Sequence, residues 1–467
     1  MSKGGASTLA QIHKRHDVDM TQGSVFRHLL LFSLPLLAGN IFQQFYNTVD
    51  TWVVGNYVSN EAFSAVGTVT PIINMLIGSF TGLASGAGVV ISQYYGAKKF
   101  DQLRDAVHTS IALTALLSVV FTLLGIGMTP AMLHFMKTPE DVFGQSSAYL
   151  TIYFSGMAGL MFYNMGAGIL RAVGDSKRPF YYLVVTVFLN TILDLVFVIV
   201  FGMGVEGVAY ATIIAQAISA VLTMFTLLRT SSCVRLEPKK IRFHGKLLKQ
   251  IIRVGIPAAL QLAVTAFSNV FVQSYINQFG KECMGGWTAY SKIDQILFLP
   301  MQSLALAATT FVGQNLGTGL GKRARQGVRT ALTMAMVTTV VLSASVIFTA
   351  PALVSFFNDT PEVTFYGVLF LRRLTPFYLI CTVNQIYAGA LRGAGNSRAP
   401  MFIMLGSFVL FRQCYLYIMS NFISNTVIPL AMGYPAGWFV CSIITLWYYH
   451  HFQIEKNRLS LVEDPNN

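Results

Sequence analysis

The sequence predicts an all-α membrane protein with twelve transmembrane helices in two pseudo-symmetric lobes of six helices each. Three observations support this fold class: an apolar composition, twelve long apolar windows and an internal repeat. Hydrophobic residues make up 54% of the 467-residue chain and charged residues 11%, whereas soluble domains carry about 25% charged residues. Because lipid tails solvate apolar side chains directly, a bilayer accommodates a composition that a water-exposed surface would not.

Apolar windows of about 20 residues, the length that crosses the hydrocarbon core, occur twelve times along the chain. In order, they cover residues 27–50, 64–92, 106–128, 146–170, 179–202, 205–228, 251–278, 286–314, 328–351, 366–390, 400–423 and 427–450. The predicted organisation is therefore a cytoplasmic N-terminal tail (1–26), an N-lobe (27–228), a basic cytoplasmic linker (229–250), a C-lobe (251–450) and a cytoplasmic C-terminal tail (451–467).

Positive charge is distributed asymmetrically between these windows. Most of the 32 Lys and Arg residues fall in the tails, the linker and alternate loops, whereas the opposite loops carry Lys137 and Lys281. By the positive-inside rule, both termini are expected in the cytoplasm. The net charge of +13 is thus attributed to orientation, and no nucleic-acid partner is expected. We expect a multi-pass monomer in a prokaryotic plasma membrane, with membrane lipid and a small-molecule substrate as its partners.

The two halves of the chain resemble each other in sequence. The segment Leu170–Pro179 matches Leu391–Pro400 at a separation of 221 residues, and Pro35 matches Pro257 at a separation of 222. Six spans per half give both halves the same orientation, so an axis along the membrane normal should relate them, as in some transporters. Two such lobes leave a cleft that can open to either side, which alternating access requires. The sequence therefore favours a transporter over a channel or a receptor.

Three acidic residues, Asp50, Asp194 and Asp294, lie well inside apolar windows. An ionised carboxylate at the bilayer centre costs about 2.5–3.5 kcal/mol on insertion scales. Such a residue is tolerated where it faces a cavity, pairs with a base, binds a cation or takes a proton, and it is a functional candidate for that reason.

Two of these acids belong to polar clusters in the N-terminal half. Tyr46 precedes Asp50 by four residues, and Asn190 precedes Asp194 by four, a spacing that places both members of a pair on one helix face. Thr212 follows in the next window. Oxygen ligands of this kind suit a hard cation such as Na⁺, and two carboxyls can share a proton. We expect cation binding or protonation at these five residues, with structural hydrogen bonds in the bundle interior as the alternative.

Asp294 is open to two interpretations. It is either an anion in a central cavity that attracts a cationic substrate, or one partner of an internal salt bridge with Arg412 or Arg373. The candidates for a substrate cavity are Asp294, Gln43, Asn47, Gln216, Gln261, Asn269 and Tyr290.

Pro35 and Pro257 occur early in the first and seventh windows. Each removes a backbone hydrogen bond from its helix and favours a bend. We consider both as hinge candidates, with a static kink as the alternative.

The sequence does not support an enzyme. The eight His residues lie in tails or near window ends, and the five Cys residues lack metal-binding spacing. No GxxxxGK[ST] loop for ATP is present. We predict no catalytic residues and no cofactor beyond a coupling ion, H⁺ or Na⁺. The only metal expected is Na⁺, in the case that it is the coupling ion, at Asp50, Asn190, Asp194 and Thr212.

Three sequence motifs resemble those of the multidrug and toxic compound extrusion (MATE) family. They are Tyr46-Asn47-x-x-Asp50, the two Leu-Arg-x-x-Gly-x-Ser-x-x-Pro loops and Phe311–Gly317, and the resemblance covers about residues 25–450. It implies twelve spans in two lobes and export of organic cations and other compounds in exchange for H⁺ or Na⁺. In the branch related to the DinF proteins, it implies a cation site at Tyr46, Asp50, Asn190, Asp194 and Thr212.

The expected function is therefore cation-coupled antiport of xenobiotics or metabolites by alternating access. The alternative is a lipid-linked oligosaccharide flippase of a related superfamily, which can share this bundle plan. Such a flippase needs a strongly charged cavity for a diphosphate headgroup, and basic residues in mid-membrane are few here.

Overall fold

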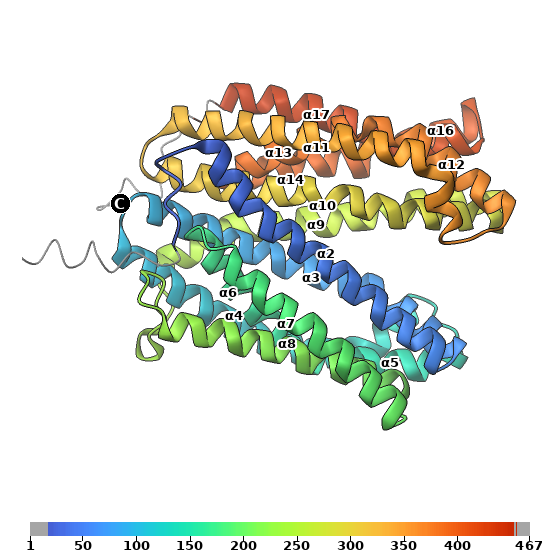
Figure 1. Ribbon diagram of the computed structural model, residues 1–467, viewed down its shortest axis with the longest axis horizontal. Coiled ribbons are helices and arrows are strands. Elements are labelled where there is room, and N and C mark those ends of the chain that lie inside the picture. Colours follow the sequence, from blue (N-terminus) through green and yellow to red (C-terminus); the bar gives the residue numbers. More distant parts are fainter. Residues whose placement is uncertain (1–16, 453, 455–467) are drawn as a thin grey trace, which may run out of the picture. The chain divides into compact units, whose positions relative to one another are not determined.

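The computed structural model describes residues 17–452 and 454, and this part of the chain folds into helices without a β-strand (Figure 1). The first half contains α2 (Val25–Tyr57), α3 (Asn60–Gly96), α4 (Phe100–Phe135), α5 (Glu140–Ser155), α6 (Met157–Ala172), α7 (Lys177–Leu195), the π-helical η1 (Val196–Val200) and α8 (Gly204–Arg229). A short 3-10 helix, η2 (Pro238–Lys240), lies in the predicted linker. The rest of the predicted tails, 1–16, 453 and 455–467, lies outside the described residues.

The second half repeats this order with more interruptions. It contains α9 (Gly245–Ile276), η3 (Asn277–Phe279), α10 (Lys281–Gly317), α11 (Gly321–Ser355), α12 (Pro361–Leu374), η4 (Thr375–Phe377), α13 (Tyr378–Gly393), α14 (Arg398–Met404), η5 (Leu405–Phe411), α15 (Arg412–Ile418), η6 (Met419–Ile423), α16 (Val427–Ala431) and α17 (Gly433–Phe452). Here η5 and η6 are π-helical, and η3 and η4 are 3-10 helices.

Ten helical segments in the described part of the chain are long and apolar enough to cross a membrane. The other two predicted spans, 146–170 and 366–390, are present as pairs of shorter helices. The helices α5 and α6 meet at Gly156, where a Cβ would lie 2.3 Å from Ile213, and η4 joins α12 to α13. Because no helix of either pair reaches about 20 residues alone, each pair together makes one span.

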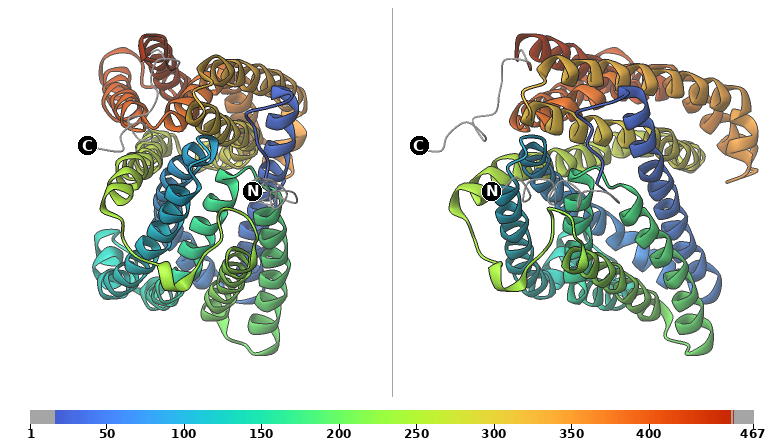
Figure 2. Two further views of the ribbon diagram at one scale, coloured as in Figure 1. Left: turned by 90° about the vertical axis from the view of Figure 1, so that its left-hand side faces the viewer. Right: turned by 60° about the vertical axis from the view of Figure 1, so that its left-hand side comes forward.

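The helices form two compact units, and within each unit the long helices run side by side (Figures 1 and 2). Unit 1 contains α3 to α8, and unit 2 contains α10 to α17. The leading helix of each repeat is divided between the units. The helix α2 belongs to unit 2 up to Leu37 and to unit 1 from Ala38, and α9 belongs to unit 1 up to Ile256 and to unit 2 from Pro257. The packing units therefore differ from the two covalent halves at these helices.

The first turns of the two leading helices are buried at equivalent positions. Val25 and Leu29 of α2 lie in the apolar core of unit 2, and Leu247 and Ile251 of α9 lie in the core of unit 1. Each residue of the first pair precedes its counterpart by 222 residues. The internal repeat thus determines which residues of the first turns of α2 and α9 are buried, as well as the position at which each helix begins.

Close helix crossings recur at the same place in both repeats. In unit 1, a Cβ on Gly168 of α6 would lie 3.0 Å from the carbonyl oxygen of Ala84 in α3. In unit 2, a Cβ on Gly389 of α13 would lie 2.6 Å from the carbonyl oxygen of Ala305 in α10. Glycine at both positions allows the helix backbones to approach each other, as is common between membrane helices.

The repeated Leu-Arg loops also fold alike. Gly174 and Gly395 have φ angles of +88° and +81°, a left-handed conformation that glycine adopts without steric cost. The next residues, Asp175 and Asn396, each donate a backbone hydrogen bond to the carbonyl five residues earlier, at 3.1 and 2.9 Å. This is the hydrogen-bond pattern of a Schellman motif, so the sequence motif ends a helix in the same way in both halves of the chain.

Candidate functional site

Asn190 connects two buried acids of unit 1, Asp50 and Asp194. With its amide nitrogen turned toward the carboxyls, it donates to Asp50 Oδ1 at 3.0 Å and to Asp194 Oδ2 at 3.2 Å. This orientation is assigned from the hydrogen-bond network, because in the reverse orientation the amide oxygen faces only acceptors. Asn190 and Asp194 are fully buried, and Asp50 is 7% exposed.

Three helices position this cluster. Asp50 lies on α2, Asn190 and Asp194 lie one turn apart on α7, and Thr212 lies on α8. The α7 span changes to the π-helical η1 at Val196, two residues after Asp194. Single π-helical turns inside α-helices occur frequently at functional sites.

Tyr46 belongs to the same cluster. Its hydroxyl donates to Thr212 Oγ1 at 3.1 Å, and the side chain lies near the Asp50 carboxyl, one helical turn further along α2. Thr212 is 1% exposed. The structure therefore brings together all five residues that the sequence proposes for cation binding or protonation.

Two tyrosines of α5 complete the cluster, and sequence reasoning missed both. Tyr149 lies near Thr212, and Tyr153 accepts a hydrogen bond from Gln216 Nε2 at 3.5 Å. Both rings are buried. Their signal in the sequence is the four-residue spacing, which places both on one helix face, but the sequence does not show which helices this face contacts.

The two carboxyl groups lie in one buried cluster, because Asn190 contacts both of them. Two carboxyls in such a cluster can share a proton, since ionising both in apolar surroundings is unfavourable. Asp194 Oδ1 is buried and has no hydrogen-bond partner among the described residues. The same oxygens are also of the type that coordinates a small hard cation. No group of three or more His, Cys, Asp or Glu residues in the described chain could hold a metal ion.

The other candidates for a substrate cavity are spread over both units. In unit 1, Gln216 joins the cluster through α5, whereas Gln43 is half-buried and Asn47 is exposed. In unit 2, Gln261 is buried and donates to Met404 Sδ at 2.8 Å. The cluster in unit 1 thus includes one of these candidates, and Gln261 contributes to packing in unit 2.

Arg412 is the centre of a polar cluster in unit 2. Its Nε donates to Ser268 Oγ and its Nη2 to Asn269 Oδ1, both at 3.1 Å. The guanidinium lies over the rings of Phe408 and Tyr434, 5.3 and 4.8 Å from their centroids. The side chain is 1% exposed. Neutral acceptors and ring faces therefore stabilise this buried charge.

Asp294 on α10 does not pair with either arginine considered for it. No ion pair within 4.0 Å joins it to Arg412 or Arg373 among the described residues, so the salt-bridge interpretation is wrong. Its carboxyl lies near Tyr290, whose hydroxyl is 3.1 Å from that of Tyr378. Asp294 Oδ1 is buried without a hydrogen-bond partner in the described chain. The interpretation as a cavity anion stays a prediction.

The hinge candidates lie where the leading helices pass from one unit to the other. The boundaries follow Leu37 and Ile256, within two residues of Pro35 and at Pro257 itself. A backbone hydrogen bond is missing at each proline. The positions suit a hinge, and the hinge role stays a prediction.

Comparison with known proteins identifies relatives over the whole chain. A family model described as MatE matches residues 35–196 and 257–418, two segments that coincide with the internal repeat. The chain is 28% identical to the probable multidrug resistance protein YpnP of Bacillus subtilis, over 94% of this chain and 98% of that protein. It is 23% identical to the probable multidrug resistance protein NorM of Thermotoga maritima, over 92% and 93%.

Solved transporter structures share the fold. A MOP superfamily transporter from Pyrococcus furiosus superposes with a TM-score of 0.88 at 22% identity, over 93% of this chain and 97% of that one. An outward-facing MATE family transporter gives the same TM-score and identity, over 94% and 98%. These similarities confirm the predicted fold class of twelve helices in two lobes.

Proposed function

The chain belongs to the MatE family, whose members are multi-pass membrane transporters and not enzymes, and on this basis we propose that it is a proton-coupled antiporter that exports organic cations by alternating access. The observation that carries the proposal is the contact of Asn190 with both Asp50 and Asp194. Two acids in one buried cluster provide a place for a coupling ion inside the membrane.

The coupling ion in this proposal is the proton. In its assigned orientation the amide of Asn190 donates to both carboxyls. Two carboxyls held in one buried cluster can share a proton, because ionising both in apolar surroundings is unfavourable. This pairing of two acids is the basis on which we propose H⁺ as the coupling ion.

Coupling requires that two conformations bind the proton with different affinity. Loss of the shared proton leaves two negative charges that repel each other in apolar surroundings. Asp50 sits in the part of α2 that belongs to unit 1, while the start of the same helix packs in unit 2. A shift of α2 on proton binding therefore acts on the packing of both units.

A cationic substrate is supported by Asp294. Its carboxyl lies in a membrane span of unit 2, and its Oδ1 has no hydrogen-bond partner in the described chain. A buried carboxylate with an open oxygen favours a positively charged ligand. Relatives whose names describe multidrug resistance or export agree with a substrate of this kind.

Transport in liposomes tests the proposal. Purified protein is reconstituted in vesicles, and movement of a fluorescent organic cation such as ethidium is measured under a pH gradient or a Na⁺ gradient imposed separately. A pH gradient alone should drive exchange. Transport driven by Na⁺ at constant pH would reject the proton as coupling ion, and no transport under either gradient would reject antiport.

The same vesicles test the flippase alternative, which the comparisons do not favour. Binding of a lipid-linked oligosaccharide without binding of organic cations would reverse that ranking. We expect the opposite result, because a buried acid such as Asp294 repels a diphosphate headgroup and attracts an organic cation.

A further inference from the structure

The segment before α2, residues 17–24, is anchored by hydrogen bonds at both of its ends, and we call it the N-terminal strap. The chain passes from unit 1 to unit 2 inside this strap, between Asp19 and Met20. Neither the acid cluster of unit 1 nor any substrate candidate includes a residue of the strap. The strap is therefore a covalent connection between the units in addition to the two leading helices.

The first anchor lies in unit 1. The backbone N–H of Val18 donates to the carbonyl oxygen of Val173, which ends α6, at 2.9 Å. The Asp17 carboxylate accepts a hydrogen bond from the Ser232 hydroxyl and lies 4.0 Å from the guanidinium of Arg178. Asp17 and Val18 thus bind to the Leu-Arg loop and the linker of unit 1.

The second anchor lies in unit 2 and centres on Met20. Its backbone N–H donates to Gln314 Oε1 at 3.0 Å, and its carbonyl accepts from Asn315 Nδ2 at 3.3 Å and from Arg323 Nη2 at 3.1 Å. Arg323 also donates to two further carbonyls of the strap, both at 2.9 Å. The Met20 side chain is 1% exposed and belongs to the apolar core of unit 2. Buried apolar area and several hydrogen bonds from a charged group make this the stronger anchor.

The chain between the two anchors is very short. Val18 and Met20 are two residues apart, and an extended chain spans at most about 7 Å over that length. The partners of both anchors lie at helix ends that the distribution of positive charge is expected to place in the cytoplasm. While both anchors hold, the strap therefore limits how far these cytoplasmic ends can separate.

The equivalent segment of the second repeat, residues 239–246, stays within unit 1. There, Thr109 Oγ1 of α4 donates to the Arg242 carbonyl at 3.4 Å and accepts from the backbone N–H of His244 at 3.3 Å. The segment that precedes it is also held in unit 1, because Leu236 lies in the apolar core of that unit. The internal repeat alone therefore does not account for a connection between the units at the N-terminal strap.

We propose that the N-terminal strap is a latch that holds the cytoplasmic side of the transporter closed, an inference that rests on the alternating access of the proposed function. Opening on this side moves the cytoplasmic ends of the lobes apart, and the strap is too short to follow without losing an anchor. Asp17 and Val18, which form the weaker anchor, leave unit 1, and Met20 stays in unit 2. Loss of the first anchor is a cost that the inward-open state has to overcome.

Distances between spin labels on the full-length protein in nanodiscs test the latch. Labels are attached at Gln102→Cys on α4 in unit 1 and Lys322→Cys on α11 in unit 2, both exposed positions, and the exposed Cys414 is replaced by Ser. Pulsed electron paramagnetic resonance gives the populations at short and long distance. Asp17→Ala removes the charged partner of Ser232 and should raise the long-distance population by roughly tenfold.

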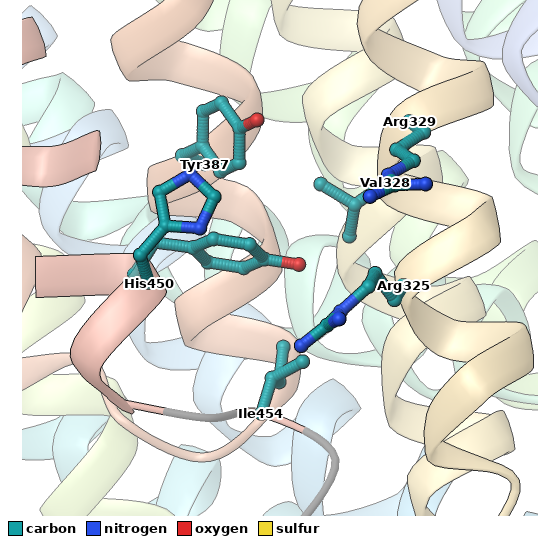
Figure 3. A pocket seen from close by; sticks show the side chains of 7 residues that line it. Arg325, Val328, Arg329, Tyr387, His450 and Ile454 are labelled. Carbon is teal, nitrogen blue, oxygen red and sulfur yellow. The ribbon is translucent and has the colours of Figure 1, made fainter. Parts of the chain in front are cut away.

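Arg329→Gln is the control for a change of charge near the same end of α11. Figure 3 shows Arg329 on the wall of a pocket, opposite Tyr387. The control should leave the label distances equal to those of the parent. A rise of the long-distance population in Arg329→Gln as large as in Asp17→Ala would overturn the latch.

Hydrogen–deuterium exchange with residue-level fragmentation tests which anchor releases, and it needs no variant for its first result. In the parent, the Val18 amide should exchange faster than the Met20 amide. Asp17→Ala should speed exchange at Val18 and leave Met20 protected. Arg323→Gln should speed exchange at Met20, whereas the matched Arg329→Gln should not.

Two outcomes contradict the inference directly. Unchanged label distances in Asp17→Ala, with exchange at Val18 accelerated, would show that release of the strap does not open the cytoplasmic side. Faster exchange at Met20 than at Val18 in the parent would overturn the order of release. These measurements use no ion gradient and no substrate, so their failure is distinct from failed transport in liposomes, which would reject the proposed function.

Discussion

Arg412 donates a hydrogen bond to Ser268, with 3.1 Å between Nε and Oγ, and so joins the eleventh span to the seventh. In the first half of the chain, the contact of Asn190 with Asp50 joins the fifth span to the first, which is the equivalent pair in the repeat. The contact between these two helices therefore contains two carboxyl groups in unit 1, and the equivalent contact in unit 2 contains a guanidinium group. Because arginine keeps its proton in proteins, unit 2 has no exchangeable proton at this crossing, which supports coupling in unit 1.

Replacement of Arg412 by Lys should destabilise the protein and preserve coupling. Lysine lacks the planar fork that makes both hydrogen bonds and stacks on the rings, and loss of a hydrogen bond to a charged group costs about 1.5–3 kcal/mol. Thermal unfolding in detergent measures the first effect, and proton-driven efflux per folded protein the second. Arg372→Lys, at an exposed position of α12, is the control. Normal stability with lost coupling would contradict the structural role.

Replacement of Asp50 by Asn should abolish gradient-driven export, because the side chain can no longer release a proton. Export should fall to the level of vesicles without protein, while the amount of folded protein in the membrane stays close to that of the parent. Asp101→Asn, at the exposed start of α4, is the matched control and should export normally. Undiminished export by the Asp50 variant in energised vesicles would refute the coupling role.

Replacement of Tyr149 by Phe tests the part of the cluster that the sequence did not reveal. The variant loses a buried hydroxyl that lies near Thr212 and Asp50 and so removes one dipole from the surroundings of the two acids. We expect a fall of several-fold in export at an unchanged expression level. Tyr181→Phe, at an exposed position of α7, should have no effect. Equal behaviour of the two variants would remove Tyr149 from the site.

Replacement of Gly389 by Ala should destabilise unit 2, because the new Cβ would lie 2.6 Å from the Ala305 carbonyl oxygen. Gly168→Ala should have a smaller effect, since its closest contact would be 3.0 Å. Overpacking of this kind typically costs about 1–3 kcal/mol. Gly67→Ala, where nothing lies within 4 Å, should leave the midpoint of thermal unfolding equal or higher. An equal effect at Gly67 and Gly389 would mean that the close crossing does not determine stability.

Replacement of Pro35 or Pro257 by Ala should slow export without lowering stability. Each change restores a backbone hydrogen bond in the helix interior, where proline costs about 3 kcal/mol, and so stiffens the segment that joins the two units. Pro130→Ala in α4, a helix contained within unit 1, is the control. Export equal to that of the parent in both variants, with folded protein present, would support the static kink instead.

Much of this molecule follows from local patterns in the sequence. The apolar windows predict the spans, the Leu-Arg motifs predict the repeat, and the four-residue spacing of Asn190 and Asp194 predicts that both share a helix face. An acid inside an apolar window, such as Asp50, can be identified as a functional candidate in any fold, because the free-energy cost of placing its carboxylate in the membrane does not depend on which helices surround it.

Only the tertiary structure showed that Tyr149 lies near Thr212 and that Arg412 pairs with neutral groups instead of Asp294. These contacts depend on the rotation of each helix about its own axis. In a soluble protein, the apolar stripe of a helix indicates that rotation. In a membrane, lipid tails and the protein interior are equally apolar, so hydropathy does not distinguish the packed face from the lipid face.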